Sequence, residues 1–369
     1  MDRFSKIKKI DADLATISLP FRNITPLNVE EEREKVEEDP DHNPVFSYAE
    51  PLGCDEAITA LQSIDKDDSV VGGLLEKKRV ELLNHALRLK FLGTRKFQKF
   101  NDLVYGLPSQ EVIAQAEEVL LPYKDISPRT IPSAQVISRI RAELNHFGIR
   151  NYRVEERSLG ASSVSVLASK NTVFVARNQF FSENYVRRLL IHEVGTHVLR
   201  AENGKQQPLN IFTSGFGGYL GTEEGLAVFN EKRFDLLTLK TLGTYAARVI
   251  CTALAQETSF QSIYHYMLRF FDKNTAFQLA MRAKRGVKYT KKKGGSTKDH
   301  LYFSGFLSVQ DFIHKGGTIR DLYVGKIGVE DVNAIKGIPW LKQARYLPKN
   351  QFFKDLLSFS NKEETKKSI

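Results

Sequence analysis

The sequence predicts an α+β protein that is mostly helical, with a small β-sheet next to a helix that carries two histidines. Apolar residues recur every three to four positions over most of the 369-residue chain, which is the helical period. Three short runs rich in β-branched residues lie together between residues 152 and 178, directly before the helical pattern with His192 and His197. A hydrophobic content of 41% and a charged content of 27% are typical of a globular protein with a buried core.

The N-terminal part of the chain is expected to be helical. Residues 1–25 predict a helix and an extension, and the acidic residues 30–44 predict a loop or the exposed start of a helix. Apolar residues then follow the helical spacing from 55 to about 121. Pro122 and the segment SPRTIPS (127–133) end this pattern, so we expect a boundary there.

The next part predicts a helix, a sheet and a second helix. SAQVISRIRAELNHFGI (133–149) has helical spacing, and Ser133 is its expected N-cap. The runs YRVEERS, SVSVLAS and TVFVARN predict three strands. The pattern returns to a helix over 182–204, where Ser182 is expected to cap the start and Gly204 to end it.

Helices are expected to dominate the remainder. One begins around Thr222, and helical patterns continue to about residue 280. Residues 286–297 predict a basic, flexible loop, DHLYFSGFL predicts a short apolar element, and the rest is expected to be helical up to a polar tail. The chain should thus comprise a helical N-terminal region, a core with C-terminal helices and a disordered tail, which are residues 1–125, 126–358 and 359–369.

The formal net charge of +10 favours acidic partners, which are nucleic acid, anionic lipid or an acidic peptide tail. Part of the charge is concentrated in KYTKKKGG (288–295), and a solvated, loop-borne cluster is the favoured interpretation of it. No RNA-binding aromatic box or zinc finger accompanies this charge, so specific nucleic-acid binding is not expected. No apolar run reaches 18 residues and the start lacks the apolar core of a secretory signal, so neither a membrane span nor export is expected. Cys54 and Cys251 lie far apart and form no disulfide framework, which favours a cytoplasmic location.

The segment HEVGTH, residues 192–197, carries candidate metal ligands at an unusual spacing. The familiar zinc-protease motif has histidines four residues apart on a helix, whereas His192 and His197 are five apart. Five residues of an ideal α-helix turn by about 140°, so both imidazoles could not reach one ion. A π-type turn would realign them, and Gly195 eases the distortion because it has no Cβ. The sequence therefore predicts a widened helical turn.

A catalytic zinc site has three protein ligands and one open position. Glu224, in TEEGLAVF at the start of another helix, is the best candidate for the third ligand, and its neighbour Glu223 is the alternative. Glu193 is the candidate general base. The residues around the motif are apolar, so the turn should be buried, where unpaired histidines and glutamates are costly unless they bind a metal.

Three segments together resemble one family: HEVGTHVLRAENGKQQPLNIF, GTEEGLAVFNE and RGVKYTKKKGGSTKDHLYFSGF. The family includes the vertebrate microtubule-associated tyrosine carboxypeptidases and bacterial proteins labelled flavohemoglobin expression-modulating QEGLA motif proteins. The H-E-x-x-x-H spacing and the EGLA segment are marks of this family, and the resemblance covers roughly residues 50 to 350. EEGLA stands here for QEGLA, and GGSTKD stands for text like GGAFTKD, but neither change removes a catalytic group.

The resemblance implies a zincin-like metallopeptidase core in which His192, His197 and Glu224 bind Zn²⁺ and Glu193 acts as the base. The activity associated with the family is removal of the C-terminal tyrosine of α-tubulin. The length of this chain is like that of the bacterial members, so the tubulin substrate is not carried over.

A carboxypeptidase must also hold a free carboxylate, which calls for Arg or Lys. The candidates are Arg285 and Lys298, whose alternative is a solvated basic loop, and Tyr302, which could instead donate to the oxyanion. The strand TVFVARN could pair with an extended peptide, or it could be an ordinary inner strand.

The leading hypothesis is a zinc-dependent carboxypeptidase acting on a peptide or protein C-terminus. The alternatives are a zinc-binding regulatory protein without peptidase activity and a binding module in which the motif is only structural. The sequence does not indicate the oligomeric state.

Overall fold

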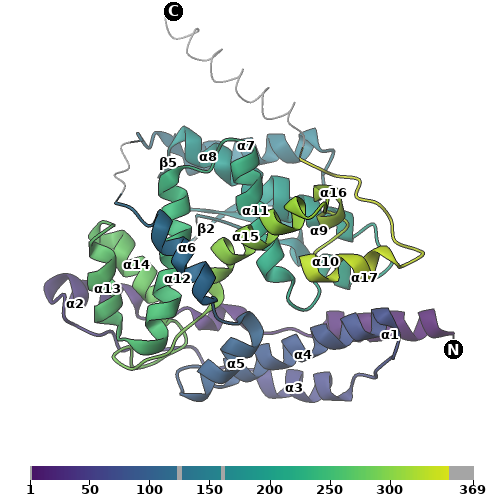
Figure 1. The fold of residues 1–369 in the computed structure, drawn as a ribbon, viewed down its shortest axis with the longest axis horizontal. Helices are drawn as coiled ribbons and strands as arrows, with labels where there is room; N and C mark the ends of the chain where they lie inside the picture. Colours follow the sequence, from purple (N-terminus) through teal and green to yellow (C-terminus); the bar gives the residue numbers. More distant parts are fainter. Residues whose placement is uncertain (1, 123–126, 159–162, 349–369) are drawn as a thin grey trace, which may run out of the picture.

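A computed structural model describes residues 2–122, 127–158 and 163–348 of the chain (Figure 1). The structure is 61% helical and contains two small sheets, which confirms the predicted mostly helical α+β class. Within the described ranges, none of the helices has the length and apolar character needed to cross a membrane. Cys54 and Cys251 are both buried and free.

The N-terminal part is helical, as predicted. Its helices are α1 (Arg3–Thr16), α2 (Val29–Glu38), α3 (Cys54–Ser63), α4 (Val70–Lys90), α5 (Lys96–Tyr105) and α6 (Gln110–Val119), with a 3₁₀ turn η1 (Phe21–Ile24). Polar side chains begin several of them: Ser69 accepts from the backbone N–H of Gly72, and Ser109 accepts from that of Val112. Helices α1, α3, α4 and α5 lie together along one side of the molecule, whereas α6 packs against the helices of the C-terminal half (Figure 1).

The three predicted strands form one mixed sheet. They are β2 (Arg153–Arg157), β3 (Val164–Leu167) and β4 (Thr172–Ala176), in the order β2-β4-β3. β4 runs parallel to β2 and antiparallel to β3, so both of its edges are already paired. The expectation that the TVFVARN strand accepts a peptide by strand addition is therefore wrong, and its alternative, an inner strand, is confirmed. A second, two-stranded sheet pairs β1 (Ile131–Pro132) with β5 (Phe180–Phe181).

Helix α7 (Ser133–His146) covers the sheet, but Ser133 does not cap it. The cap position falls on Pro132, and the Ser133 hydroxyl instead donates to the carbonyl oxygen of Ala176 at 2.7 Å, which ties the helix to β4. The predicted 182–204 helix is present as α8 (Glu183–Leu189), a π-helical segment η3 (Leu190–Val198) and α9 (Leu199–Gly204). Ser182 caps its start, as expected.

The C-terminal half is built from helices that pack around the histidine-bearing segment. They are α10 (Ile211–Ser214), α11 (Tyr219–Arg233), α12 (Leu239–Glu257), α13 (Phe260–Leu268), α14 (Lys273–Lys284), α15 (Leu301–His314), α16 (Ile319–Leu322) and α17 (Val332–Lys336), with 3₁₀ turns η2 (Ala168–Lys170), η4 (Lys298–His300) and η5 (Val329–Asp331).

Three predictions for this half need correction. Helix α11 begins at Tyr219 rather than Thr222, whose hydroxyl accepts from the N–H of Val329. The DHLYFSGFL segment is the start of the full helix α15 and not a short element. Residues 337–348 form no helix.

Two hydrophobic clusters make up most of the core. One joins α1, α4, α7, the larger sheet and the π-helical segment, and the other joins α2, α6 and α12 to α15. Both clusters draw residues from either side of position 125, and the division of the chain at that position stays a prediction. The predicted tail, 359–369, lies outside the described residues.

Helices α11 and α15 cross with their backbones almost in contact. A Cβ added at Gly225 would lie 2.1 Å from the backbone carbon of Gly305, and one added at Gly305 would lie 2.0 Å from the carbonyl oxygen of Gly221. Only glycine fits at this crossing, because the obstructing atoms are backbone. Since Glu224 precedes Gly225 and Tyr302 is on α15, the crossing sets how these two side chains approach each other.

We expect Gly225→Ala to destabilise the protein by about 1–3 kcal/mol or more, because the new methyl group forces the two helices apart. The matched control is Gly73→Ala in α4, where a Cβ meets nothing within 4 Å. There, the higher helix propensity of alanine should raise stability by about 0.5–1 kcal/mol. Urea denaturation of both variants gives the comparison, and equal stabilities would contradict the crossing as described.

Candidate metal centre

The helix that carries both histidines widens at the predicted place. Residues Leu190–Val198 form a π-helix, which confirms the widened turn. The ring centroids of His192 and His197 lie 5.0 Å apart, so the wider turn brings the two imidazoles to one side. A Cβ at Gly195 would lie 2.7 Å from Cδ1 of Ile191, so glycine also relieves crowding inside the turn.

Side-chain hydroxyls bind the carbonyl oxygens of the widened turn. Thr196 Oγ1 donates to the carbonyl of Ile191 at 3.0 Å, and Tyr323 OH donates to that of Gly195 at 2.7 Å. The amide of Asn230 donates to both hydroxyl oxygens at 2.8 Å. These contacts stabilise a backbone geometry that rarely persists in α-helices without such support.

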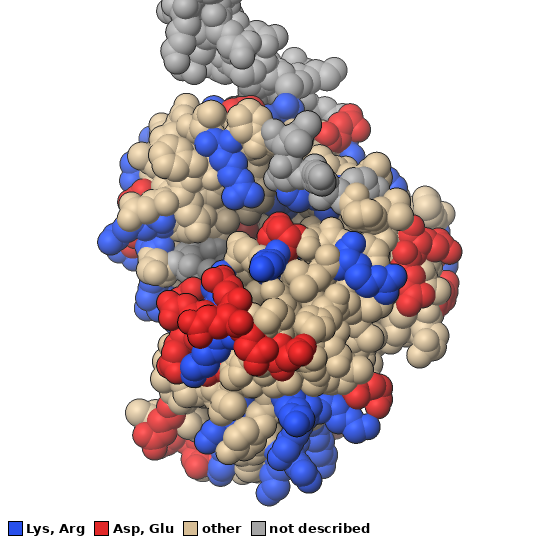
Figure 2. All heavy atoms as spheres, turned by 90° about the vertical axis from the view of Figure 1, so that its left-hand side faces the viewer, with Lys and Arg blue, Asp and Glu red and all other residues tan. Residues whose placement is uncertain are grey.

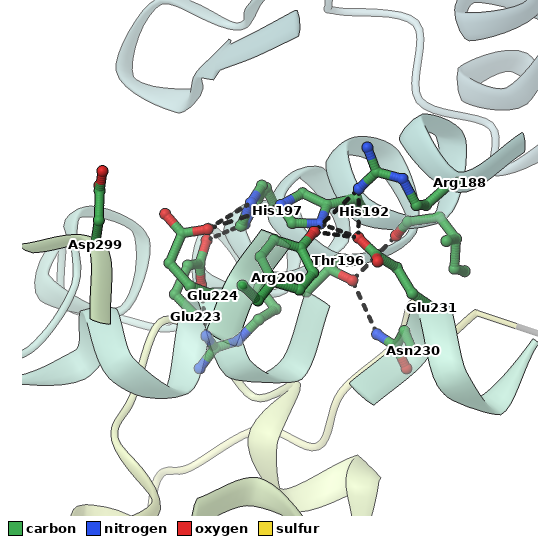
Figure 3. Close-up of polar contacts among 12 residues, drawn as sticks. Arg188, His192, Thr196, His197, Arg200, Glu223, Glu224, Asn230, Glu231 and Asp299 are labelled. Atoms are coloured by element: carbon green, nitrogen blue, oxygen red, sulfur yellow. Dashed lines mark hydrogen bonds and ion pairs between the residues drawn. The ribbon is translucent and has the colours of Figure 1, made fainter. Parts of the chain in front are cut away.

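Among the residues that the structure describes, His192, His197 and Glu224 form the group that could hold a metal ion, with ligand atoms all within 4.8 Å of one another. Nε2 of His192 and Nε2 of His197 lie 3.7 and 3.8 Å from the same carboxylate oxygen, Oε2 of Glu224 (Figure 3). That oxygen is buried and has no hydrogen-bond partner among the described residues. Ligands about 2.0–2.2 Å from a tetrahedral zinc ion are about 3.4 Å apart, so this donor set fits such an ion.

Two further glutamates of α11 hold the other nitrogen of each histidine. Nδ1 of His192 lies 2.7 Å from Oε1 of Glu231, and Nδ1 of His197 lies 2.9 Å from Oε1 of Glu223 (Figure 3). A carboxylate can only accept, so each Nδ1 carries the proton and each Nε2 keeps its lone pair for a metal. The structure thus places Glu223, the alternative third ligand, behind His197.

Positively charged side chains pair with Glu223 and Glu231, which we call the outer carboxylates. Arg188 and the Tyr245 hydroxyl each donate to Oε1 of Glu231 at 3.0 Å. Arg200, which is fully buried, donates to Glu223, and Lys326 lies 3.0 Å from it. The sequence pattern alone did not predict that Glu223 and Glu231 hold the histidines or that these cations pair with them. One signal was present, because Glu231 lies seven residues after Glu224 and therefore on the same face of the helix.

Burial and charge act in opposite directions on the carboxylates at the centre. Burial raises the pKa of Glu224, but contacts with His192, His197 and Lys298 outweigh it and lower the pKa to about 2. Burial raises the pKa of Glu193, and the two histidines oppose this only in part. A carboxylate with a raised pKa beside the candidate metal group is suited to taking up a proton.

His192, His197 and Glu224, here called the metal group, line a cleft of about 1120 Å³. Glu193 and all three predicted substrate-binding residues also line this cleft. Tyr302 lies nearly parallel to the His192 ring at 6.4 Å between centroids. Lys298 starts the turn η4 and is half-buried, so it does not belong to a solvated loop. Arg285 lies 3.4 Å from both carboxylate oxygens of Asp299.

Hydrogen bonds from Lys284 hold part of the predicted flexible loop 286–297 against α12. The buried ammonium group of Lys284 donates to four carbonyl oxygens, those of Ala255, Thr258, Lys292 and Gly294. The loop's lysines 288 and 291–293 point to solvent.

Charges on the molecular surface are also segregated. On the side where α2 lies, acidic side chains gather in one patch and basic side chains in a separate cluster (Figure 2). More basic than acidic side chains line the cleft; its Arg and Lys residues are Arg22, Arg33, Arg129, Arg157, Arg188, Lys240, Arg248, Arg282, Arg285, Lys298 and Lys326.

Two histidines and a glutamate with a second carboxylate beside them are the residue set of catalytic zinc hydrolases, so fold and site define a helical protein with a candidate metallohydrolase centre. The model of the microtubule-associated tyrosine carboxypeptidase family matches residues 35–364. The chain belongs to this family.

Curated relatives support the assignment. Mouse and rat microtubule-associated tyrosine carboxypeptidase 1 are 23% and 24% identical over 343 and 346 residues, which is 90% of this chain and 65% and 64% of theirs. The human protein MATCAP2, whose name only proposes a tyrosine carboxypeptidase activity, is 31% identical over 163 residues, 42% of this chain and 31% of the relative. The matches span less than two thirds of the length of these relatives.

We expect Tyr323→Phe to destabilise the protein by about 1–3 kcal/mol, because the buried Gly195 carbonyl and the Asn230 amide both lose a partner. Tyr152→Phe is the matched control, since the Tyr152 hydroxyl is buried without a partner among the described residues. Removing that hydroxyl should be neutral or stabilising. Chemical denaturation measures both, and a neutral Tyr323→Phe would show that the hydroxyl does not support the widened turn.

Proposed function

We propose that the protein is a zinc-dependent carboxypeptidase that removes a residue from the C-terminus of a peptide or protein. The observation that carries this proposal is the convergence of His192, His197 and the unpartnered oxygen of Glu224 on one point of a large cleft. The family and the names of its relatives supply the reaction type.

The donor set favours zinc over other common metals. Two imidazole nitrogens and one carboxylate oxygen are a known catalytic zinc set, whereas calcium and magnesium prefer oxygen ligands throughout. The carboxylates on the Nδ1 atoms fix the orientation of both rings and increase their basicity as ligands. A zinc ion bound there would act as a Lewis acid that polarises the scissile carbonyl and makes a water molecule acidic.

The chain's own residues then carry the proton transfers. Glu193 takes the proton of the attacking water on its carboxylate and passes it to the nitrogen of the leaving residue. Burial raises the pKa of Tyr302, so its hydroxyl stays protonated and can donate to the oxygen that gains negative charge. Closely packed aromatic rings of Tyr302 and Tyr245, 5.5 Å apart and 8° from parallel, hold this side chain in place.

The cleft indicates the kind of substrate. Its basic lining favours a chain whose terminal carboxylate is preceded by acidic residues, since such a segment is attracted along the whole cleft. The names of the relatives suggest tyrosine as the residue removed.

Purified wild-type protein should contain about one zinc ion per chain, because the site supplies three ligands in a buried position. His192→Ala should remove most of the metal, whereas His265→Ala, at an exposed histidine of α13, should leave it unchanged. Elemental analysis by mass spectrometry gives the stoichiometry. Equal metal contents in wild type and His192→Ala would exclude this site.

Glu193→Gln should keep the metal and lower the rate of C-terminal cleavage by about 10²–10⁴-fold, because the amide cannot accept the proton. The control is Glu183→Gln, which alters a carboxylate of α8 that pairs with Arg139 and does not line the cleft. Mass spectrometry of a peptide library with varied C-termini measures both. A metal-loaded wild type that cleaves no member would instead favour the regulatory alternative.

A further inference from the structure

Two arginines beside the cleft already have a carboxylate partner. Arg282 donates to both oxygens of Asp299, at 2.5 Å from Nε and 2.9 Å from Nη2. Arg285 approaches the same carboxylate at 3.4 Å. Burial raises the pKa of Asp299, but these arginines and Arg248 together hold it well below its usual range. The Asp299 carboxylate therefore accepts hydrogen bonds from Arg282 and Arg285, and it also interacts electrostatically with Arg248.

Arg248 on α12 is the third guanidinium, and no hydrogen bond of two of its three nitrogens is found in the part of the chain that the structure describes. Its Nε and Nη1 are buried and have no hydrogen-bond partner among the described residues. Its Cζ stacks 4.3 Å from the ring centroid of Tyr302 and 5.3 Å from that of Tyr245. Aromatic stacking fixes the plane of the group but satisfies none of its N–H donors. Buried donors of a charged group left without an acceptor are costly, so the geometry suits an anion.

Tyr302 packs against Arg248 and faces the His192 ring, so the guanidinium and the metal group lie in the same part of the cleft. The Tyr302 ring centroid lies 4.3 Å from Cζ of Arg248 and 6.4 Å from the centroid of the His192 ring. One residue of extended chain spans about 3.6 Å, and a guanidinium–carboxylate contact adds about 3 Å. A peptide whose last amide carbonyl lies at the metal group would carry its terminal carboxylate about that far into the part of the cleft that Arg248 lines.

We propose that Arg248 binds the α-carboxylate of the residue to be removed and so makes the cleft specific for chain ends. This inference rests on the proposed carboxypeptidase function and revises the expectation for Arg285, whose guanidinium is occupied by Asp299. The planar fork of Arg248 presents two donors to two carboxylate oxygens, which a lysine cannot reproduce. Arg282 and Arg285 keep Asp299 from turning toward Arg248 and competing with the substrate.

The test compares binding of a peptide acid with binding of its amide. The probe is a fluorescent hexapeptide of glycine and alanine that ends in tyrosine, made with either a free carboxylate or a carboxamide. Zinc-loaded Glu193→Gln protein, which retains the cleft, should bind the acid at least tenfold more tightly than the amide in an anisotropy titration. Adding Arg248→Gln should reduce this preference to less than twofold, and Arg248→Lys should leave an intermediate preference.

Arg269→Gln, added to the same background, is the matched control. Arg269 also lies over an aromatic ring, 5.1 Å from that of Tyr266, but it does not line the cleft. It should leave the acid preference unchanged. Thermal unfolding and metal content establish that each variant is folded and loaded, and Arg248→Lys carries the test if the glutamine variant does not fold.

The results distinguish failure of the Arg248 inference from failure of the carboxypeptidase proposal. If Arg248→Gln weakens acid and amide equally, or weakens neither, Arg248 only packs against Tyr302 and the inference is overturned. The carboxypeptidase proposal is tested apart from this, by whether the wild type shortens the peptide acid. An Arg248-dependent preference without cleavage would support the carboxylate site and contradict the enzymatic function.

Discussion

The structure depends on a single departure from α-helical geometry. Two imidazoles five residues apart cannot face one point on an ideal helix, and the π-helical segment Leu190–Val198 removes this conflict. Such a turn persists only if the surroundings over-determine it. Here the glycine at 195, the hydroxyl of Thr196 and the hydroxyl of Tyr323 do so, and Asn230 connects the two hydroxyls to α11. The geometry of the histidines is thus fixed from a neighbouring helix as well as from their own.

Helix α11 organises the centre through the spacing of its glutamates. Glu224 points at both Nε2 atoms, while Glu223 and Glu231 take the two Nδ1 atoms. Together with Glu193 this buries four carboxylates, yet the cations Arg188, Arg200 and Lys326 pair only with the outer two. Among the described residues, the inner two form no ion pair with an arginine or lysine, and Glu224 lies closest to the two histidines. A bound divalent cation would complete the charge balance, which is why the electrostatics of the chain itself favour a metal.

The metal group could be predicted from the sequence because its signals are local. The five-residue spacing of His192 and His197 predicted the widened turn, and the position of Glu224 at the start of a later helix indicated it as the third ligand. The roles of Arg188, Tyr245, Arg248 and Asp299 could not be predicted, because they depend on how α8, α12 and η4 meet in space. Ser133 shows the same limit: its position suggested an N-cap, but a tertiary bond to the Ala176 carbonyl was more favourable. Likewise, strand order cannot be inferred from a run of β-branched residues, so the inner position of β4 became evident only from the sheet.

The cleft has an acidic part and a basic part, and their positions affect how a charged peptide can bind in it. Glu193 and Glu224 make the metal side negative until a cation binds, whereas Arg248, Arg282 and Arg285 make the opposite side positive despite Asp299. Such a difference in charge within one cleft acts on a charged ligand as it approaches. Under the proposed function, a terminal carboxylate would be repelled from the bare carboxylates and attracted to the arginines, one residue beyond the scissile bond. An internal segment of a chain carries no charge at that point and gains nothing there. In the proposed enzyme the arrangement would therefore select chain ends by their charge, before any bond is broken.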